Sequence, residues 1–120
     1  MERVRFIRHN GVTILKVDLS HPTSIEENLA VIKQAKAVIG THPPKSLLIL
    51  TDVTGTTFNA KAVEEMKHYS AFNTPFVKAS AVVGISRLAK IIYDAIVRVV
   101  GRAVVSFDTE AEALDWLAKQ

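Results

Sequence analysis

Residues 46–57 read SLLILTDVTGTT, a run of four aliphatic residues that gives way to a polar loop containing one glycine. A continuous apolar run of this length is typical of a strand covered on both faces, as the inner strands of parallel sheets are. The stretch therefore predicts an inner strand over residues 46–53, with a loop at its carboxyl end. Helices are expected before and after such a strand, because both of its faces must be covered.

The flanking sequence supplies these helices and four further strands. Asn10-Gly11 predicts a tight hairpin turn between strands over residues 2–8 and 12–19. Capping boxes at Ser24/Glu27 and Thr109/Glu112 mark two helix starts. Periodicity, caps and breakers predict helices over 25–39, 60–72, 87–100 and 110–119, and strands over 76–83 and 103–107.

The resulting order is β-β-α-β-α-β-α-β-α. It predicts a single α/β domain over residues 1–120 with a mixed five-stranded sheet and four helices. The amino-terminal hairpin is expected at one edge, where Arg3, Arg5 and Arg8 would discourage pairing with another molecule.

The composition excludes several classes of protein. The chain has 120 residues, of which 48% are hydrophobic and 22% charged, with a net charge of +3 and no cysteine. Disulfide scaffolds, thiolate nucleophiles and cysteine-ligated metal sites are therefore excluded. No signal-peptide pattern is present and no apolar run approaches about 20 residues, so we expect a cytoplasmic protein without a transmembrane segment.

Dedicated chemical motifs are absent from the sequence. It has no GxSxG, GxGxxG or GxxxxGK[ST] pattern, and its basic residues are not interleaved with exposed aromatic residues. Glu64 and His68 are four residues apart on a predicted helix, a spacing more typical of a surface pair than of a metal site. We therefore predict a non-enzymatic protein with no cofactor, no metal and no nucleic-acid partner. The histidines are scattered, at His9, His21, His42 and His68.

Two segments resemble a known family. Residues 75–84 read PFVKASAVVG, and residues 107–117, after a predicted helix and strand, read FDTEAEALDWL. Together with the element order they are similar to the bacterial SpoIIAA-like (STAS-like) proteins, and the resemblance covers essentially the whole chain. It implies the STAS fold and a non-catalytic module that binds partner proteins or, in some members, nucleotides. Related lipid-transfer folds hold apolar ligands.

One departure from the family pattern concerns regulation. STAS proteins that are switched by phosphorylation have a pair of serines at the start of the helix after the third strand. Residues 58–62 of this chain read FNAKA, without a serine. A serine switch at this position is therefore not expected, whereas phosphorylation of a threonine just upstream is left open.

Two loops carry candidate ligand-binding residues. Both precede a predicted helix, whose free N–H groups favour anions. The alternative is ordinary turn and cap chemistry, in which the side chains only satisfy the backbone. The candidates are Asp52, Thr54, Thr56 and Thr57 in the first loop, and Ser86 and Arg87 in the second.

The helix predicted over residues 87–100 is apolar around most of its circumference. A surface helix needs an apolar stripe of a little over about 100°. The stripe expected to face the core consists of Leu88, Ile91, Ile92, Ala95, Ile96 and Val99. The surplus apolar residues, which form a candidate interface, are Ala89, Tyr93, Val97 and Val100.

The surplus leads to two functional hypotheses. The first is a protein-interaction or regulatory module that forms a homo-oligomer or binds a protein partner through this helix. The alternative is a protein that binds a small apolar, lipid-like ligand in a pocket between this helix and the sheet, with residues 52–57 at its mouth. A weaker third hypothesis is an enzyme with its catalytic groups on the same loops.

Overall fold

The computed structural model describes residues 3–56, 60–86, 90–91, 94 and 104–120. Its sheet has five strands, which lie side by side in chain order. The first pair is antiparallel and each later strand is parallel to the one before it. This confirms the predicted mixed sheet with an antiparallel edge. The strands are β1 (Val4–His9), β2 (Val12–Asp18), β3 (Leu47–Asp52), β4 (Val77–Val83) and β5 (Val104–Phe107).

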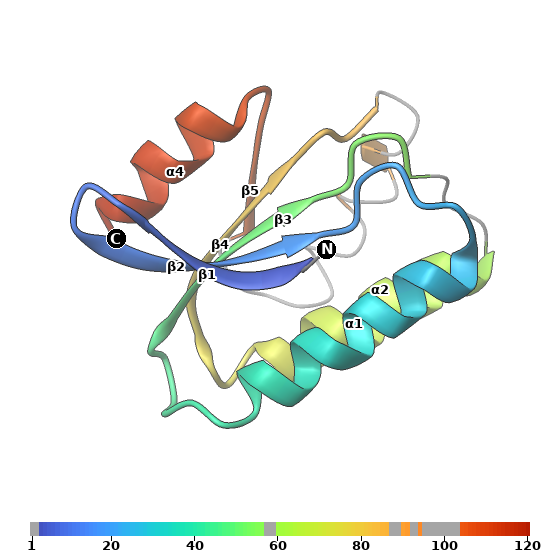
Figure 1. Cartoon of the computed structure of the whole chain (residues 1–120), viewed down its shortest axis with the longest axis horizontal. Helices are drawn as coiled ribbons and strands as arrows, with labels where there is room; N and C mark the ends of the chain where they lie inside the picture. The colour runs from blue at the N-terminus through green and yellow to red at the C-terminus, as the bar shows by residue number, and fades with distance from the viewer. Residues whose placement is uncertain (1–2, 57–59, 87–89, 92–93, 95–103) are drawn as a thin grey trace.

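The helices form a layer on each face of the sheet. Helices α1 and α2 cover one face, and α4 lies on the other (Figure 1). The Lys16 ammonium lies 2.6 Å from the Glu110 carboxylate, and the His9 imidazole lies 2.6 Å from the Asp115 carboxylate, so two polar contacts join α4 to the hairpin. The helices are α1 (Ile25–Ile39), α2 (Ala60–Asn73) and α4 (Glu110–Ala118).

The number and order of helices differ from the prediction. The described part of the chain contains three helices, not four, in the order β-β-α-β-α-β-β-α. The difference arises because the helix predicted over residues 87–100 lies mainly outside the described residues. Of that segment only Lys90, Ile91 and Asp94 are described, and all three are helical.

Local sequence rules account for the predicted boundaries. Asn10 and Gly11 have φ angles of 51° and 77°, so both adopt the left-handed conformation that a two-residue hairpin turn requires. Ser24 Oγ accepts a hydrogen bond from the Glu27 N–H at 3.1 Å and caps α1. The Glu27 carboxylate reaches one residue further back than a capping box predicts and accepts from the Thr23 hydroxyl at 2.8 Å.

The apolar residues of the inner strands divide between two cores. Because successive side chains of a strand point to opposite faces, Ile49 packs on the α1–α2 side and Leu50 on the α4 side. The second core also contains Ile14 and Leu117, both fully buried. Burying such a side chain stabilises the fold by about 1.5–3 kcal/mol. The apolar run at 47–50 is thus explained by a strand that serves both cores.

Two large apolar side chains are exposed, and one of them was predicted to face the core. Ile91 was placed in a core-facing stripe, but its side chain is 74% exposed. Helical spacing shows which residues share a face, whereas packing decides whether that face meets the sheet. Phe6 shares a face of the edge strand with Val4, which is buried, yet Phe6 itself is 46% exposed. Its ring contacts the His42 ring at a centroid distance of 5.5 Å.

Within the described residues, no helix combines the length and the hydropathy needed to cross a membrane.

Candidate functional site

A cavity of about 240 Å³ lies between α1 and α2, beside the carboxyl ends of β2 and β3. We call it the α1–α2 cavity. One wall is the face of α1 formed by residues at positions i, i+3, i+4 and i+7, and the opposite wall is a similar face of α2. Open α/β sheets bind ligands at the carboxyl ends of their strands, so the position is typical of a binding site. The wall residues are Ile25, Asn28, Leu29 and Ile32 of α1, and Ala62, Glu65 and Met66 of α2.

The loops after β2 and β3 close one end of the cavity and are joined to each other. The His21 N–H donates to the Thr54 carbonyl at 2.8 Å, and the Thr56 hydroxyl donates to the Leu19 carbonyl at 2.8 Å. Gly55 has a φ of +73° and lies so close to His21 that a Cβ there would be 2.7 Å from the imidazole Nδ1. A side chain at position 55 is therefore disfavoured both by the left-handed conformation and by contact with the His21 ring.

Two polar side chains of the walls lack partners. Asn28 Oδ1 is shielded from solvent and accepts no hydrogen bond. Glu65 is half-buried, and no hydrogen bond or ion pair joins its carboxylate to another described residue. Buried polar groups are normally hydrogen-bonded, so the Asn28 oxygen is unusual, whereas the Glu65 oxygens are not among the buried atoms that lack a partner.

The sequence did not single out these two residues. Helical spacing puts Glu65 beside Glu64 and His68 at the polar face of α2, but Glu65 lines the cavity, because α1 packs beside α2 there. Asn28 lies within the apolar stripe of α1, between Ile25 and Ile32. A polar residue at a stripe position was a signal that could have identified it.

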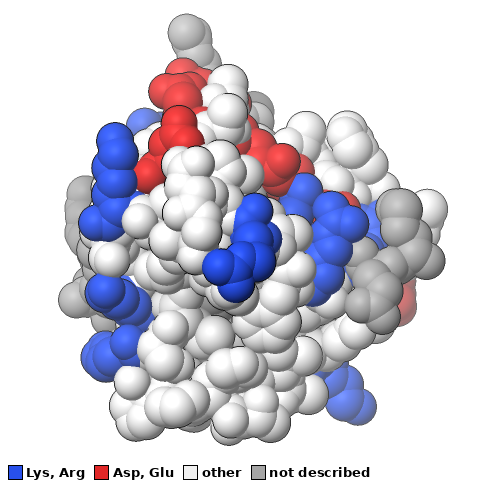
Figure 2. Space-filling view, turned by 60° about the vertical axis from the view of Figure 1, so that its left-hand side comes forward, with Lys and Arg blue, Asp and Glu red and all other residues white. Residues whose placement is uncertain are grey.

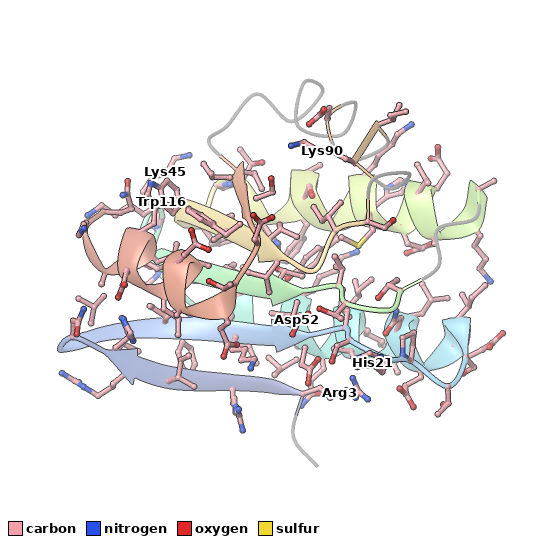
Figure 3. All side chains as sticks on the ribbon, turned by 90° about the horizontal axis from the view of Figure 1, so that it is seen from above. Arg3, His21, Lys45, Asp52, Lys90 and Trp116 are labelled. Carbon is pink, nitrogen blue, oxygen red and sulfur yellow. The ribbon has the colours of Figure 1, made fainter. Side chains whose placement is uncertain are left out.

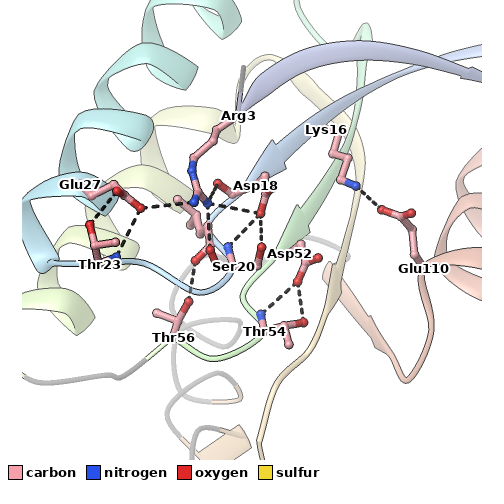
Figure 4. A network of polar contacts seen from close by, with 11 residues as sticks. Arg3, Lys16, Asp18, Ser20, Thr23, Glu27, Asp52, Thr54, Thr56 and Glu110 are labelled. Carbon is pink, nitrogen blue, oxygen red and sulfur yellow. Dashed lines mark hydrogen bonds and ion pairs between the residues drawn. The ribbon is translucent and has the colours of Figure 1, made fainter. Parts of the chain in front are cut away.

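The predicted loop residues are divided between the two faces of the sheet. Thr56 lines the α1–α2 cavity. Asp52 has the same strand parity as Leu50 and so belongs to the α4 face (Figure 3). Its carboxylate accepts from the Thr54 N–H at 3.0 Å and the Thr54 hydroxyl at 2.7 Å (Figure 4). Hydrogen bonds of this kind stabilise a turn. They fit the alternative interpretation of the loop, in which the side chain of Asp52 satisfies the backbone instead of contacting a ligand.

The remaining candidates fall partly outside the described residues. Thr57 and Arg87 are not described. Ser86 is exposed, and its carbonyl accepts from the Lys90 N–H at 3.0 Å, which is the i to i−4 spacing of a helix. The interface residues Ala89, Tyr93, Val97 and Val100 also lie outside the described residues. Their predicted roles stay predictions.

A polar network lies beside the cavity, with Arg3 at its centre (Figure 4). The guanidinium donates to the Ser20 carbonyl at 2.8 Å and lies 3.6 Å from the Asp18 carboxylate and 3.3 Å from that of Glu27. Burial would raise the pKa of Asp18, but bonds from the Ser20 hydroxyl and N–H, with the charges of Arg3 and Lys16, lower it overall. Arg3 is therefore fully engaged by acceptors outside the cavity.

The same network acts on Glu27 at the start of α1. The hydrogen bond from the Thr23 hydroxyl lowers the pKa of Glu27, and the positive charge of Arg3 lowers it further. The carboxylate is held in the first turn of α1, where the helix dipole also favours a negative charge. The amino-terminal end of α1 is thus already occupied by an anionic group of the protein itself.

Positive charge is not concentrated on the surface shown. In Figure 2, Lys and Arg side chains stand at separated points of the face, while Asp and Glu side chains gather toward one end. Among the described residues, no group of three or more His, Asp or Glu side chains is placed to hold a metal ion. The predicted absence of metal and nucleic-acid binding stays a prediction.

Comparison with known proteins identifies the fold. Neither family models nor curated proteins give a match. The structure is similar to the crystal structure of an uncharacterized protein from the DUF3478 family, with a SpoIIAA-like fold, from Shewanella loihica PV-4. The TM-score is 0.71 at 16% sequence identity, and the match covers 95% of this chain and 91% of that chain. The predicted resemblance to the SpoIIAA-like fold is confirmed, and at this identity the likeness concerns the fold alone.

Proposed function

We propose that the protein is a non-enzymatic module that binds a small, mainly apolar ligand in the α1–α2 cavity. The observation that carries the proposal is this cavity of about 240 Å³, with mainly apolar walls, at the carboxyl ends of β2 and β3. It modifies the hypothesis drawn from the sequence, which placed the pocket beside residues 87–100. Of the predicted loop, Thr56 adjoins the cavity and Asp52 does not.

The size of the cavity limits the ligand. An apolar cavity of about 150 Å³ is large enough to bind benzene. A cavity of about 240 Å³ therefore suits a compact molecule of roughly six to ten non-hydrogen atoms. Ligands of this size bind with dissociation constants in roughly the micromolar to millimolar range. A long acyl chain would extend beyond the cavity.

The test is to fill the cavity and measure binding of a compact neutral probe. Ala62 lines the cavity, whereas Ala37 is exposed on α1, so the same Ala→Leu change at each position provides a matched pair. Cyclohexanol should shift the backbone amide NMR signals of residues around the cavity in the native protein and in Ala37→Leu. In Ala62→Leu the same titration should give shifts at least about fivefold smaller.

The outcomes separate binding from non-specific contact. Shifts that are absent from the native protein, or that persist unchanged in Ala62→Leu, would contradict the proposal. Native mass spectrometry of freshly purified protein provides a second measurement. A co-purified small mass that is lost in Ala62→Leu and retained in Ala37→Leu would support it.

A second candidate function is self-association through residues 87–100. The specific observation in its favour is Ile91, a large apolar side chain that is 74% exposed beside an exposed lysine, Lys90. Light scattering after gel filtration should detect a dimer that Ile91→Asp, Tyr93→Asp or Val97→Asp dissociates without unfolding. Lys90→Asp serves as the control with the same new residue at a polar position. A protein that stays monomeric at high concentration would refute self-association.

A further inference from the structure

We propose that the free edge of β1 binds an extended acidic segment of a partner protein, which adds a further strand to the sheet. The complementary segment has two apolar residues between two acidic ones, because this edge reads Arg5-Phe6-Ile7-Arg8. None of these four residues lines the α1–α2 cavity, so the proposal does not depend on ligand binding there. It is carried by main-chain groups that face outward, an exposed aromatic ring and two cations without a carboxylate partner among the described residues.

Main-chain groups along β1 point away from the sheet. β1 is the first strand in the sheet order and, among the described strands, pairs only with β2. Figure 3 shows it at the outer border of the sheet. The Arg3 carbonyl accepts from the Asp18 N–H at 2.8 Å, so the odd-numbered residues of β1 bond to β2. The N–H and C=O groups of Phe6 and Arg8 therefore face outward, as the groups that an added strand binds do, and both residues are exposed.

The side chain of Phe6 offers an added strand an apolar contact. Phe6 is 46% exposed, and its ring lies against the His42 ring at a centroid distance of 5.5 Å. The imidazole of His42 is in turn held by its Nδ1, which lies 2.9 Å from the Val38 carbonyl oxygen. The Phe6 ring is therefore supported from within the fold while much of it stays in contact with solvent. An apolar residue opposite Phe6 would cover this surface, as in other cross-strand pairs with an aromatic residue.

Arg5 and Arg8 determine the charge of the partner. Both are exposed, and no carboxylate of a described residue forms an ion pair with either. Arg8 donates to the Gly11 carbonyl at 2.9 Å, whereas Arg3 is already engaged by two carboxylates. Residues 3–17 include no acidic residue, so nothing within the hairpin offsets the two positive charges. A carboxylate on an added strand would supply the missing partner for each arginine.

The order of residues along the edge defines the order expected in the partner. Residues that lie opposite each other on paired strands have their side chains on the same face and in contact. An acidic residue is therefore expected opposite each arginine, and an apolar residue opposite each of the two residues between them. The resulting order, acidic-apolar-apolar-acidic, is the same in both directions. It suits a parallel as well as an antiparallel strand.

A second copy of this chain is a less suitable occupant of the edge. Two β1 strands side by side would bring Arg5 and Arg8 of both chains onto one short edge, where like charges repel. The same charges attract an acidic strand. The two arginines therefore disfavour self-pairing and favour a partner of opposite charge.

The probe is the capped peptide Thr-Glu-Val-Val-Glu-Thr, added to the full chain and followed by NMR. The backbone signals of β1 should shift, and amide hydrogen exchange at Phe6 and Arg8 should slow at least about fivefold near saturation. Exchange at Arg5 and Ile7, whose N–H groups already face β2, should change less. A peptide with lysine in place of both glutamates should bind the native protein at least about tenfold more weakly.

Charge reversal on the protein provides the matched comparison. In the double variant Arg5→Glu/Arg8→Glu the preference should invert, so that the lysine peptide binds at least about tenfold more tightly than the glutamate peptide. Lys61→Glu/Lys90→Glu changes the net charge by the same amount at two exposed positions outside the hairpin, and it should keep the native preference. If a variant does not fold, the two peptides compared on the native protein decide.

Four outcomes would overturn the proposal. The first is the absence of shifts in β1 at about 5 mM glutamate peptide. The second is an equal loss of binding in both double variants, which would indicate attraction to net charge alone. The third is undiminished binding of a peptide methylated at both valine nitrogens, because that peptide cannot donate to the Phe6 carbonyl. The fourth is a dimer that forms without peptide and slows exchange at Phe6 and Arg8, which would assign the edge to a second copy.

Discussion

Replacing Gly84 with alanine tests the close approach of the loops that follow β3 and β4. Gly84 has a φ of +85°, and a Cβ there would lie 2.6 Å from the Thr54 backbone nitrogen and 2.7 Å from its Cα. These are backbone atoms, and the Thr54 N–H is held by a hydrogen bond of 3.0 Å to the Asp52 carboxylate. The loop after β3 therefore has to move to admit a methyl group.

The expected cost has two parts. A non-glycine residue in the left-handed region costs about 1–2 kcal/mol, and forcing extra volume into a packed position costs about 1–3 kcal/mol. Gly84→Ala should therefore lower the free energy of unfolding by about 2–5 kcal/mol. At about 4 °C per kcal/mol for a chain of this length, Tm should fall by roughly 8–20 °C.

The assay is urea unfolding followed by the fluorescence of Trp116, the single tryptophan, whose ring lies 5.7 Å from that of Phe107. Gly11→Ala is the matched control, because Gly11 has a φ of +77° and nothing within 4 Å of an added Cβ. It should lose only the conformational part, about 1–2 kcal/mol. If the two variants lose the same free energy of unfolding within about 0.5 kcal/mol, the close approach at Gly84 is refuted.

Three further predictions concern stability. Gly55→Ala should lower the free energy of unfolding, because the added methyl group would meet the His21 ring. Since this obstacle is a side chain, adding His21→Ala should restore about 1 kcal/mol of the loss, measured as a double-mutant cycle of urea unfolding. Because the pKa of Asp18 is lowered in the folded state, its carboxylate stabilises the fold fully above the unfolded pKa of about 3.9. This stabilisation is lost as the pH falls through the folded pKa. The difference in the free energy of unfolding between the native protein and Asp18→Asn should therefore shrink between pH 5 and about 2. Leu117→Ala, at a fully buried position, should cost about 2–5 kcal/mol in thermal unfolding, and Leu114→Ala, at a half-buried one, clearly less.

The parts of the fold that follow from local rules were predictable. The Asn10-Gly11 turn, the caps at Ser24 and Thr109, and the inner strand at 47–50 each depend on residues within one element or turn. The antiparallel edge was predictable from these local rules, and the SpoIIAA-like fold from the resemblance of two segments to that family, whereas the order of the strands within the sheet comes from the structure.

The candidate site was less predictable because it depends on how elements pack against one another. Helical spacing places Glu65 and Glu64 next to each other at the border of a polar face, and only the position of α1 distinguishes them. Strand parity had a similar effect at the end of β3. Asp52 and Val53 are consecutive in the predicted loop, yet Val53 lines the α1–α2 cavity and Asp52 belongs to the opposite face.

The α1–α2 cavity is the place where the sequence departs from the best solution for stability. Further along the same two helices, Ala35 and Tyr69 are buried in the core, although Asn73 of α2 also has a buried oxygen without a partner. At the end nearer to the carboxyl ends of the strands, the corresponding wall positions hold Asn28, Ala62 and Glu65, which leave space, an unsatisfied oxygen and an unpaired charge. Larger apolar residues at these positions would remove all three costs, as cavity-filling substitutions do. Local conflicts of this kind are expected where a protein binds a ligand, and here they coincide at the strand ends where α/β sheets bind theirs. The unfilled cavity makes the fold less stable, and a ligand that fills it would therefore recover this free energy on binding.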